Sequence, residues 1–395
     1  MRKITADLIL PISLKPIRNG VIIVDDNGKI LKLDDRRNYD DLELEIYDGV
    51  IVPGFINAHC HLELSHMKGK VGTGKGLIPF ITDVVTKRAA SESEISTAIA
   101  KAEAEMIKNG IVAVGDISNV TDTFAQKAKG NLRYYTFVEF FDFLQDDNAQ
   151  VEFDTFKAVF DALEVGEGSK KSLVPHAPYS VSKSLFKMLK EANAANDENV
   201  TISIHNQELK AENDLFETKT GNFIKFYESF GISLNDFEAT GESSIHYALE
   251  NMNPNHKTLF IHNTKSTIED IQAAQRWGGE NVYWVTCPNA NLYIENSLPD
   301  YRHFIDTNVN IAIGTDSLTS NWQLSILDEI KAIAKFQSYI PLEMLLRWAT
   351  MNGAEALGFD DTLGSIEVGK VPGLNLLNIG KDFKLTEKTT VKKLI

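Results

Sequence analysis

The chain has 395 residues, a length that exceeds one ordinary compact core and suits one large domain plus a smaller one. Its 40 lysines and arginines against 55 acidic residues give a net charge of −15, which disfavours nucleic acid and anionic membranes as partners. Only two cysteines are present, Cys60 and Cys287, so the chain can build neither a disulfide framework nor an all-cysteine zinc site.

The amino-terminal residues predict neither a secretory signal nor a membrane anchor. The apolar stretch at residues 8–12 is short and interrupted by a proline. No window approaches the roughly 20 apolar residues that a membrane helix requires. We therefore expect a cytoplasmic protein.

Both ends of the chain predict short strands. The apolar runs 20–24 and 30–33 flank the turn Asp26-Asn27-Gly28, which is a hairpin signal. Residues 364–379 have a similar pattern of short apolar runs and turn residues. We expect residues 1–50 plus 362–395 to form one small β-sandwich domain around a central domain of residues 51–361.

The central part alternates apolar runs with segments of helical periodicity, such as 97–109 and 184–196. The strand candidates are 51–59, 111–116, 132–140, 172–177, 200–205, 257–262, 281–287 and 309–316. Eight successive strand–helix units predict an α/β fold, a (β/α)8 TIM barrel of the usual ~250 residues. An open doubly wound sheet is the alternative, but no G-x-G-x-x-G turn follows the first strand.

Five of the nine histidines fall at the predicted carboxyl ends of strands, where barrel enzymes have their active sites. These are His59, His61, His176, His205 and His262, and Asp316 ends the last strand. A single histidine there is as often structural as metal-binding. His59 and His61, two residues apart on a strand, face the same side. Together with His205 and Asp316 they offer three nitrogens and one carboxylate, a set suited to zinc or another borderline metal.

Several segments carry a family resemblance. They are Val52-Pro53-Gly54-Phe55-Ile56-Asn57-Ala58-His59-Cys60-His61, His176-Ala177-Pro178-Tyr179-Ser180, His205-Asn206-Gln207-Glu208, Cys287-Pro288-Asn289-Ala290-Asn291-Leu292 and Gly314-Thr315-Asp316-Ser317-Leu318-Thr319-Ser320-Asn321. In this order they resemble the amidohydrolase superfamily, and within it the metal-dependent deaminases of adenosine, S-adenosylhomocysteine and aminodeoxyfutalosine, to which chlorohydrolases are related.

The resemblance implies one divalent metal ion per chain, zinc or else iron, held by His59, His61, His205 and Asp316. It also implies that Glu208 shuttles protons as the catalytic acid and base. The remaining implied roles are those of His262, which would polarise the attacking water, and His176, which would contact substrate. Binuclear relatives carry a modified lysine at the end of strand four, where this chain has Val174-Pro175-His176. That difference favours a single metal.

The implied reaction is hydrolytic deamination of an aminated heterocycle, in which metal-bound hydroxide attacks and ammonia leaves. His61-Leu62-Glu63-Leu64-Ser65 is similar to a stretch of aminodeoxyfutalosine deaminases, so the substrate is expected to be that compound or an adenosine derivative. Glu63, Ser317 and Asn321 are expected to contact it. For Glu63, a charge pair with Lys68 or Lys70 is an equal alternative.

Other functions stay open at this point. The same metal hydroxide would serve a cyclic amidohydrolase or a chlorohydrolase, and a metal-containing binding protein without activity is a third class. Glu208 and His262 argue against the last, because a pure binder needs neither. Deaminases with H-x-E and P-C-x-x-C signatures are excluded by the two cysteines. We expect a small-molecule substrate, with a homo-oligomer left open.

Long insertions after the first and fifth strands are expected to cover the site. The glycine-rich residues 67–80 resemble a lid over it. Six aromatic residues form either a substrate wall or the packing of inserted helices, and packing is preferred; they are Phe80, Phe216, Phe223, Phe226, Tyr227 and Phe230. Arg88 and Arg133 are the candidates for binding a substrate carboxylate.

Overall fold

The structure, a computed structural model, describes residues 1–197, 199–380 and 383–395. Both ends of the chain contribute to one six-stranded sheet with the order β14-β13-β4-β1-β2-β3. Its strands are β1 (Arg2–Ile9), β2 (Gly20–Val24), β3 (Ile30–Asp35), β4 (Glu45–Pro53), β13 (Leu374–Leu377) and β14 (Val391–Lys393). The predicted hairpin is confirmed, since β2 and β3 pair antiparallel and Gly28 has a φ of +81° in the turn between them.

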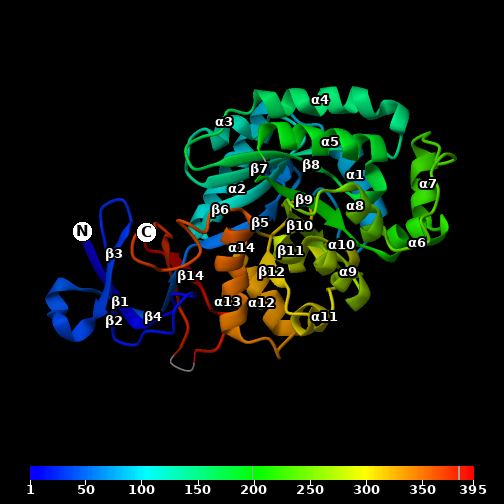
Figure 1. Cartoon of the computed structure of the whole chain (residues 1–395). Helices are drawn as coiled ribbons and strands as arrows, with labels where there is room; N and C mark the ends of the chain where they lie inside the picture. The colour runs from blue at the N-terminus through cyan, green and yellow to red at the C-terminus, as the bar shows by residue number, and fades with distance from the viewer. Residues whose placement is uncertain (198, 381–382) are drawn as a thin grey trace.

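The terminal sheet differs from the expected sandwich. Among the described residues it is a single sheet, with β1 and β4 parallel and its other pairs antiparallel, so a second sheet packed on it is not confirmed. One of its faces buries a small apolar cluster that includes Ile4, Ile22 and Leu374. Figure 1 shows this sheet, with both chain ends, beside the larger part of the molecule.

The larger part has eight parallel strands in two four-stranded sheets, ordered β5-β6-β7-β8 and β12-β11-β10-β9. The strands are β5 (Phe55–Cys60), β6 (Ile111–Ser118), β7 (Arg133–Phe140), β8 (Lys170–Pro175), β9 (Thr201–Asn206), β10 (Lys257–His262), β11 (Val282–Thr286) and β12 (Asn310–Ile313). Most of their residues are buried on both faces, as parallel strands covered by helices are. The predicted alternation of strands and helices is confirmed.

Backbone hydrogen bonds join the two sheets where their strands end. The His205 N–H donates to the His176 carbonyl at 2.8 Å, linking β9 to the end of β8. At the other seam, the N–H groups of Thr315 and Asp316 both donate to the His59 carbonyl, at 3.1 and 3.0 Å. The carboxyl ends of β5, β8, β9 and β12 are therefore held close together.

Helices cover the outer faces of these sheets (Figure 1). They are α1 (Leu77–Lys87), α2 (Glu92–Lys108), α3 (Phe124–Lys127), α4 (Ala149–Ala162), α5 (Lys183–Asn196), α6 (Lys210–Thr218), α7 (Asn222–Ser229), α8 (Ser244–Asn251), α9 (Ile268–Gly278), α10 (Pro288–Glu295), α11 (Tyr301–Asp306), α12 (Ile326–Phe336), α13 (Leu342–Ala349) and α14 (Met351–Ala356). Across the described residues, none of these helices is long and apolar enough to traverse a bilayer.

Three helices or strands begin or end at other residues than the sequence predicted. The helix predicted from residue 97 begins at Glu92, because Ser91 and Glu94 form a capping box that starts it one turn earlier. The strand predicted at 51–59 is two strands that meet at Gly54, where a Cβ would approach the Pro372 carbonyl oxygen to 2.6 Å. The strand predicted at 309–316 ends at Ile313, because the N–H groups of Thr315 and Asp316 leave the ladder with β11 and donate to the His59 carbonyl.

Candidate metal centre and active site

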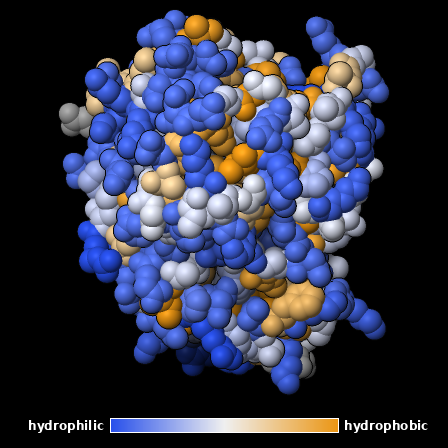
Figure 2. All heavy atoms as spheres, turned by 90° about the vertical axis from the view of Figure 1, so that its right-hand side faces the viewer, coloured by the Kyte–Doolittle hydropathy of each residue, from blue (hydrophilic) through white to orange (hydrophobic). Residues whose placement is uncertain are grey.

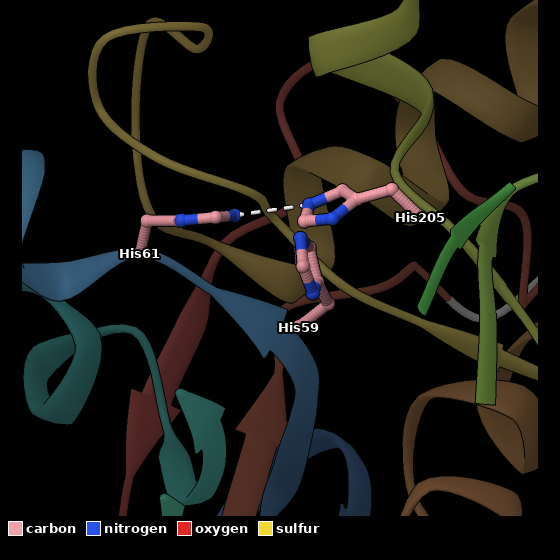
Figure 3. Close-up of side chains that lie close together, drawn as sticks. All are labelled: His59, His61 and His205. Carbon is pink, nitrogen blue, oxygen red and sulfur yellow. Dashed lines mark hydrogen bonds between the residues drawn. The ribbon is translucent and has the colours of Figure 1, made fainter. Parts of the chain in front are cut away.

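Three histidine rings and one carboxylate converge at the carboxyl ends of the strands. His59 lies in β5, His61 directly follows that strand, and His205 lies in β9. One ring nitrogen from each lies within 4.8 Å of the others, and the Nε2 atoms of His61 and His205 are 3.2 Å apart (Figure 3). Oδ1 of Asp316 is 3.9 Å from His59 Nε2 and 3.7 Å from His61 Nε2. The structure thus brings together the four predicted ligands.

The turn after β5 sets the position of His61. The next residue, Leu62, donates its backbone N–H to Asp116 Oδ1 on the neighbouring strand β6 at 2.8 Å. The other oxygen of that buried carboxylate lies 2.6 Å from Lys127 Nζ. This buried ion pair therefore anchors the point where the chain leaves β5 with His61 facing the centre.

The Asp316 carboxylate is oriented by its own turn. Oδ1 accepts the Ser317 N–H at 2.6 Å, and Oδ2 accepts the Ser320 hydroxyl at 2.8 Å. Asp316 and His262 both have left-handed backbones, with φ of +58° and +73°. Such a conformation is costly for a residue with a side chain and persists where surrounding contacts impose it, often at functional sites.

The surroundings of His59 show whether these residues fit a metal ion. It is fully buried, and neither of its ring nitrogens has a hydrogen-bond partner among the described residues. Burial, together with the neighbouring histidines, holds its pKa well below the usual value, and burial lowers the pKa of His61 to about 3. Neutral imidazoles that face one point with a free lone pair are the form in which histidine binds metal. The set fits a divalent ion.

His205 is oriented from behind, as metal-binding histidines usually are. Its Nδ1 lies 2.9 Å from the His176 carbonyl and 3.3 Å from Glu139 Oε1, so Nε2 faces His61. Burial lowers the pKa of His205, but the nearby Glu139 carboxylate outweighs it and raises that pKa to about 9, so a metal ion that binds Nε2 would displace a proton from this ring. The other Glu139 oxygen accepts from Asn119 Nδ2 at 3.1 Å.

Glu208 and His262 form an acid–imidazole pair beside this centre. His262 Nε2 is 3.5 Å from Glu208 Oε2, and its Nδ1 donates to Asn291 Oδ1 at 2.8 Å, which assigns the lone pair to Nε2. Burial raises the pKa of Glu208 to about 8 and lowers the pKa of His262 to about 4. At neutral pH the pair is therefore a protonated acid next to a neutral imidazole.

A cavity opens above these groups, and we refer to it as the active-site cavity. Its chemically reactive lining is His61, His205, Glu208, His262 and Asp316, joined by His176 and Ser317. Its apolar lining includes Leu77, Phe80, Ile81 and Val84 of α1, with Phe141, Phe143, Tyr179 and Ile294. Figure 2 looks onto the side where α1, α6 and α7 lie and shows apolar side chains sunk in a hollow between polar ones.

Comparison with known proteins places the chain in a family. The profile of the Amidohydrolase family matches residues 50–395, most of the chain. The chain belongs to the amidohydrolase family. It is therefore a hydrolase that acts on carbon–nitrogen bonds, with an α/β fold of the TIM-barrel type.

Three proteins similar to this amidohydrolase are deaminases by name. An adenosine deaminase from Helicobacter pylori is 28% identical over 365 residues, covering 90% of this chain and 86% of the relative. An aminodeoxyfutalosine deaminase from Nitratiruptor sp. is 28% identical, covering 84% and 80%. The crystal structure of Helicobacter pylori aminofutalosine deaminase in complex with methylthio-coformycin has a TM-score of 0.81 at 25% identity and covers 98% of this chain and 94% of its own.

Two residues predicted to contact substrate do not line the active-site cavity of this amidohydrolase. Glu63 is buried behind the wall, where its Oε2 accepts the N–H groups of Asn119 and Val120 at 2.9 and 3.2 Å. Asn321 donates from Nδ2 to the Thr315 carbonyl at 2.7 Å and to Glu329 Oε1 at 2.8 Å. Both side chains brace the segments that carry the lining residues.

Of the two arginines predicted to bind a substrate carboxylate, one lines the active-site cavity and the other does not. Arg133 lies at the amino-terminal end of β7, opposite the site, and its guanidinium hydrogen-bonds the Thr362 hydroxyl. Arg88 follows α1 and does line the cavity. Of the aromatic residues in the insertions, Phe80 lines the cavity, whereas Phe216, Phe223, Phe226 and Tyr227 are buried in the core and Phe230 is partly exposed.

The glycine-rich segment that resembles a lid is attached to α10. The N–H groups of Gly74 and Gly76 donate to the carbonyls of Tyr293 and Ile294 at 2.7 and 3.0 Å. The Tyr293 hydroxyl donates to the Val71 carbonyl at 2.6 Å. These contacts position the start of α1, which forms the apolar wall.

Sequence reasoning missed Glu139 and Asn291. Glu139 lies near the end of the predicted strand 132–140, so inspection of every strand end for polar residues would have identified it. Asn291 belongs to the Cys287-to-Leu292 segment, but its role as the partner of His262 depends on how α10 packs.

Proposed function

We propose that this amidohydrolase is a metal-dependent hydrolytic deaminase of an aminated heterocycle in a purine nucleoside-type substrate. Aminodeoxyfutalosine or another adenosine derivative is the substrate class we favour. The observation that carries the proposal is the pairing of three convergent histidines and Asp316 with a buried, protonated Glu208 in one apolar cavity. The names of the similar proteins support the same reaction.

His59, His61, His205 and Asp316 would hold one divalent ion per chain. Three nitrogens and one carboxylate suit zinc, which is the ion we favour, and iron is the other candidate. When bound there, such an ion would lower the pKa of water towards ~7 and so would supply hydroxide near neutral pH. Asp316, whose Oδ1 lies between two of the histidines, is placed to accept the proton that this water releases.

Glu208 would supply the other proton transfers. Because its pKa is raised to about 8, it holds a proton at neutral pH and can donate it to the ring nitrogen of the substrate during attack on the adjacent carbon. The proton taken up by Asp316 would then pass to the amino group, which leaves as ammonia. The hydroxyl proton of the tetrahedral carbon would pass to the Glu208 carboxylate as the carbonyl forms, which restores both residues. His262, held by Asn291 with the Nε2 lone pair facing the centre, would accept a hydrogen bond from the attacking water and so orient it.

The cavity lining supports a ring-shaped substrate. Tyr179, Phe141 and Phe80 offer apolar and aromatic surface, and His176 and Ser317 add polar groups near the reacting atoms. His176 Nδ1 is 2.6 Å from the Ser180 hydroxyl, an arrangement that leaves its Nε2 for the substrate. Glu63 and Asn321 would act by supporting the cavity wall.

We also propose a finer description of the architecture. The eight parallel strands, joined by hydrogen bonds at both seams, would close into a (β/α)8 barrel over residues 51–361. Residues 1–50 plus 362–395 would form the second domain. The active site then lies at the carboxyl-terminal face of the barrel, where such enzymes place their catalytic residues.

Glu208→Gln tests the mechanism. We expect zinc-loaded wild-type protein to release ammonia from at least one member of a panel of adenosine-type nucleosides, guanine and pterins. In Glu208→Gln, turnover should fall by at least ~100-fold, the usual contribution of general acid–base catalysis, while metal content stays at one ion per chain. Glu217→Gln, the same change at an exposed position on α6, is the matched control.

Two results would redirect the proposal. Full activity in Glu208→Gln would contradict the role of this residue. Ammonia release from none of the panel, combined with halide release from a chlorinated heterocycle or ring opening of a cyclic amide, would favour the other hydrolases that the same metal set can serve.

A further inference from the structure

One wall of the active-site cavity is a continuous line of polar contacts that leads from the metal ligands to Arg88. Glu139 Oε1 is 3.3 Å from His205 Nδ1, and Glu139 Oε2 accepts from Asn119 Nδ2 at 3.1 Å. The backbone N–H of Asn119 donates to Glu63 Oε2 at 2.9 Å. The Glu63 Oε1 atom lies 3.6 Å from an Arg88 guanidinium nitrogen.

Glu63, the ion-pair partner of Arg88, is a buried carboxylate. Its side chain is 1% exposed, and Oε1 has no hydrogen-bond partner in the part of the chain that the structure describes. A buried carboxylate oxygen without a donor is costly unless a charge of opposite sign lies nearby. Arg88 is that charge, so the buried carboxylate restrains where the guanidinium lies.

The guanidinium N–H groups of Arg88 are available to hydrogen-bond a ligand. Within the described residues its guanidinium makes no hydrogen bond, since the contact with Glu63 is longer than one. The side chain is 38% exposed and lines the cavity. It is also the one lysine or arginine among the described lining residues. A guanidinium is a planar fork of donors that matches a carboxylate or phosphate.

The surrounding charges favour a carboxylate over a phosphate. Two carboxylates, Glu139 and Asp316, line the same cavity with the protonated Glu208, and Glu63 stands directly behind Arg88. Away from the metal ligands, the one guanidinium of the lining balances a single negative charge, whereas the second charge of a dianion would face these carboxylates without a cation of its own. The neighbouring lining from α1 is apolar, with Phe80 and Val84, and suits an uncharged spacer between the reacting ring and the anion.

We infer that Arg88 is a specificity-determining residue that binds a carboxylate on the part of the substrate remote from the deaminated ring. This inference rests on the proposed deaminase function and narrows its substrate class to nucleoside-type compounds that carry a carboxylate. Glu63 is a positioning residue, because it acts through Arg88 and does not reach the cavity.

The test compares three 5′-thioether derivatives of 5′-deoxyadenosine, which differ only in ending in a carboxylate, a carboxamide or a phosphonate. With zinc-loaded wild-type protein, we expect kcat/KM for ammonia release to be about 10- to 100-fold higher for the carboxylate than for the carboxamide, the range for a hydrogen bond to a charged group. In Arg88→Met this ratio should fall to about one through a rise in KM. Arg88→Lys should retain an intermediate ratio, because it keeps the charge and loses the fork.

Arg133→Met is the matched control, because Arg133 lies at the opposite end of β7, and it should leave the ratio unchanged. Equal kcat/KM for carboxylate and carboxamide, or a ratio that survives in Arg88→Met, would overturn the inference while leaving the deaminase intact. A preference for the phosphonate over the carboxylate would overturn the choice of ligand. Ammonia release from none of the three probes would instead overturn the proposed function, and this inference with it.

Discussion

At the scale of single residues, His59 bears the most direct evidence for a metal. Its two ring nitrogens are buried and have no hydrogen-bond partner among residues 1–197, 199–380 and 383–395. This destabilises the metal-free protein, because a buried unpaired polar atom costs about 1–3 kcal/mol. Metal coordination removes that cost for the nitrogen that binds. Buried imidazoles usually have at least one ring nitrogen hydrogen-bonded, and the neighbouring His205 and His262 each have such a bond at Nδ1, so His59 is the exception in this cluster.

His59→Leu separates the metal role from a packing role. We expect the variant to lose its metal, while the metal-free variant is at least as stable to urea as metal-free wild type, because the unpaired nitrogens are gone. Metal analysis and urea unfolding measure the two effects. The control His303→Ala, on α11, should keep one ion per chain. A variant that keeps its metal, or whose metal-free form is strongly destabilised, would contradict this account of His59.

At the scale of elements, the site depends on how closely β12 approaches β5. Gly314 follows β12, and a Cβ at this position would lie 2.8 Å from His59 Cβ and 2.9 Å from the backbone N and O of His59. The backbone contacts leave no flexible side chain that can move aside. A residue with no side chain is therefore required where Thr315 and Asp316 hydrogen-bond to the His59 carbonyl.

Gly314→Ala should therefore disturb both the fold and the metal centre. We expect a loss of about 1–3 kcal/mol in unfolding free energy, the usual cost of overpacking, together with weaker zinc binding in a chelator competition. Gly166→Ala is the matched control, since a Cβ there meets no atom of the described residues within 4 Å. Wild-type stability and zinc affinity in Gly314→Ala would show that the seam between β12 and β5 is looser than described.

At the scale of the whole molecule, one buried side chain ties the terminal sheet to the strands that carry the site. Asn375 of β13 donates from Nδ2 at 2.8 Å to the carbonyl of Gly110, the residue before β6. The same carbonyl accepts the Phe55 N–H at the start of β5. The terminal sheet thus braces the amino-terminal ends of β5 and β6, opposite the metal ligands.

Asn375→Ala should reduce the free energy of unfolding by about 1–3 kcal/mol, because it removes a buried hydrogen bond, and should leave the ratio of metal to protein unchanged. Urea denaturation followed by tryptophan fluorescence measures the first quantity. Asn378→Ala, at an exposed position just after β13, should change stability by less than ~0.5 kcal/mol. Equal stability of the two variants would remove Asn375 as a link between the sheets.

Much of this organisation could be predicted from the sequence, for identifiable reasons. Parallel buried strands read as apolar runs, and their carboxyl ends meet at one edge, so the positions of His59, His61, His205 and Asp316 along the chain suffice to group them. The division at Gly54 could not be predicted, because it depends on the approach of Pro372 from the far end of the chain. Likewise, Asn321 lies in a family segment, yet its amide faces Glu329 of α12 and not the cavity. Packing between distant segments decides such orientations.

Stepwise addition of zinc to metal-free protein, with ammonia release followed at each step, tests the central claim most directly. A mononuclear deaminase built on His59, His61, His205 and Asp316 predicts activity that rises in proportion to zinc and reaches its plateau at one equivalent per chain. A plateau at two equivalents, or full activity in the protein to which no zinc has been added, would contradict it.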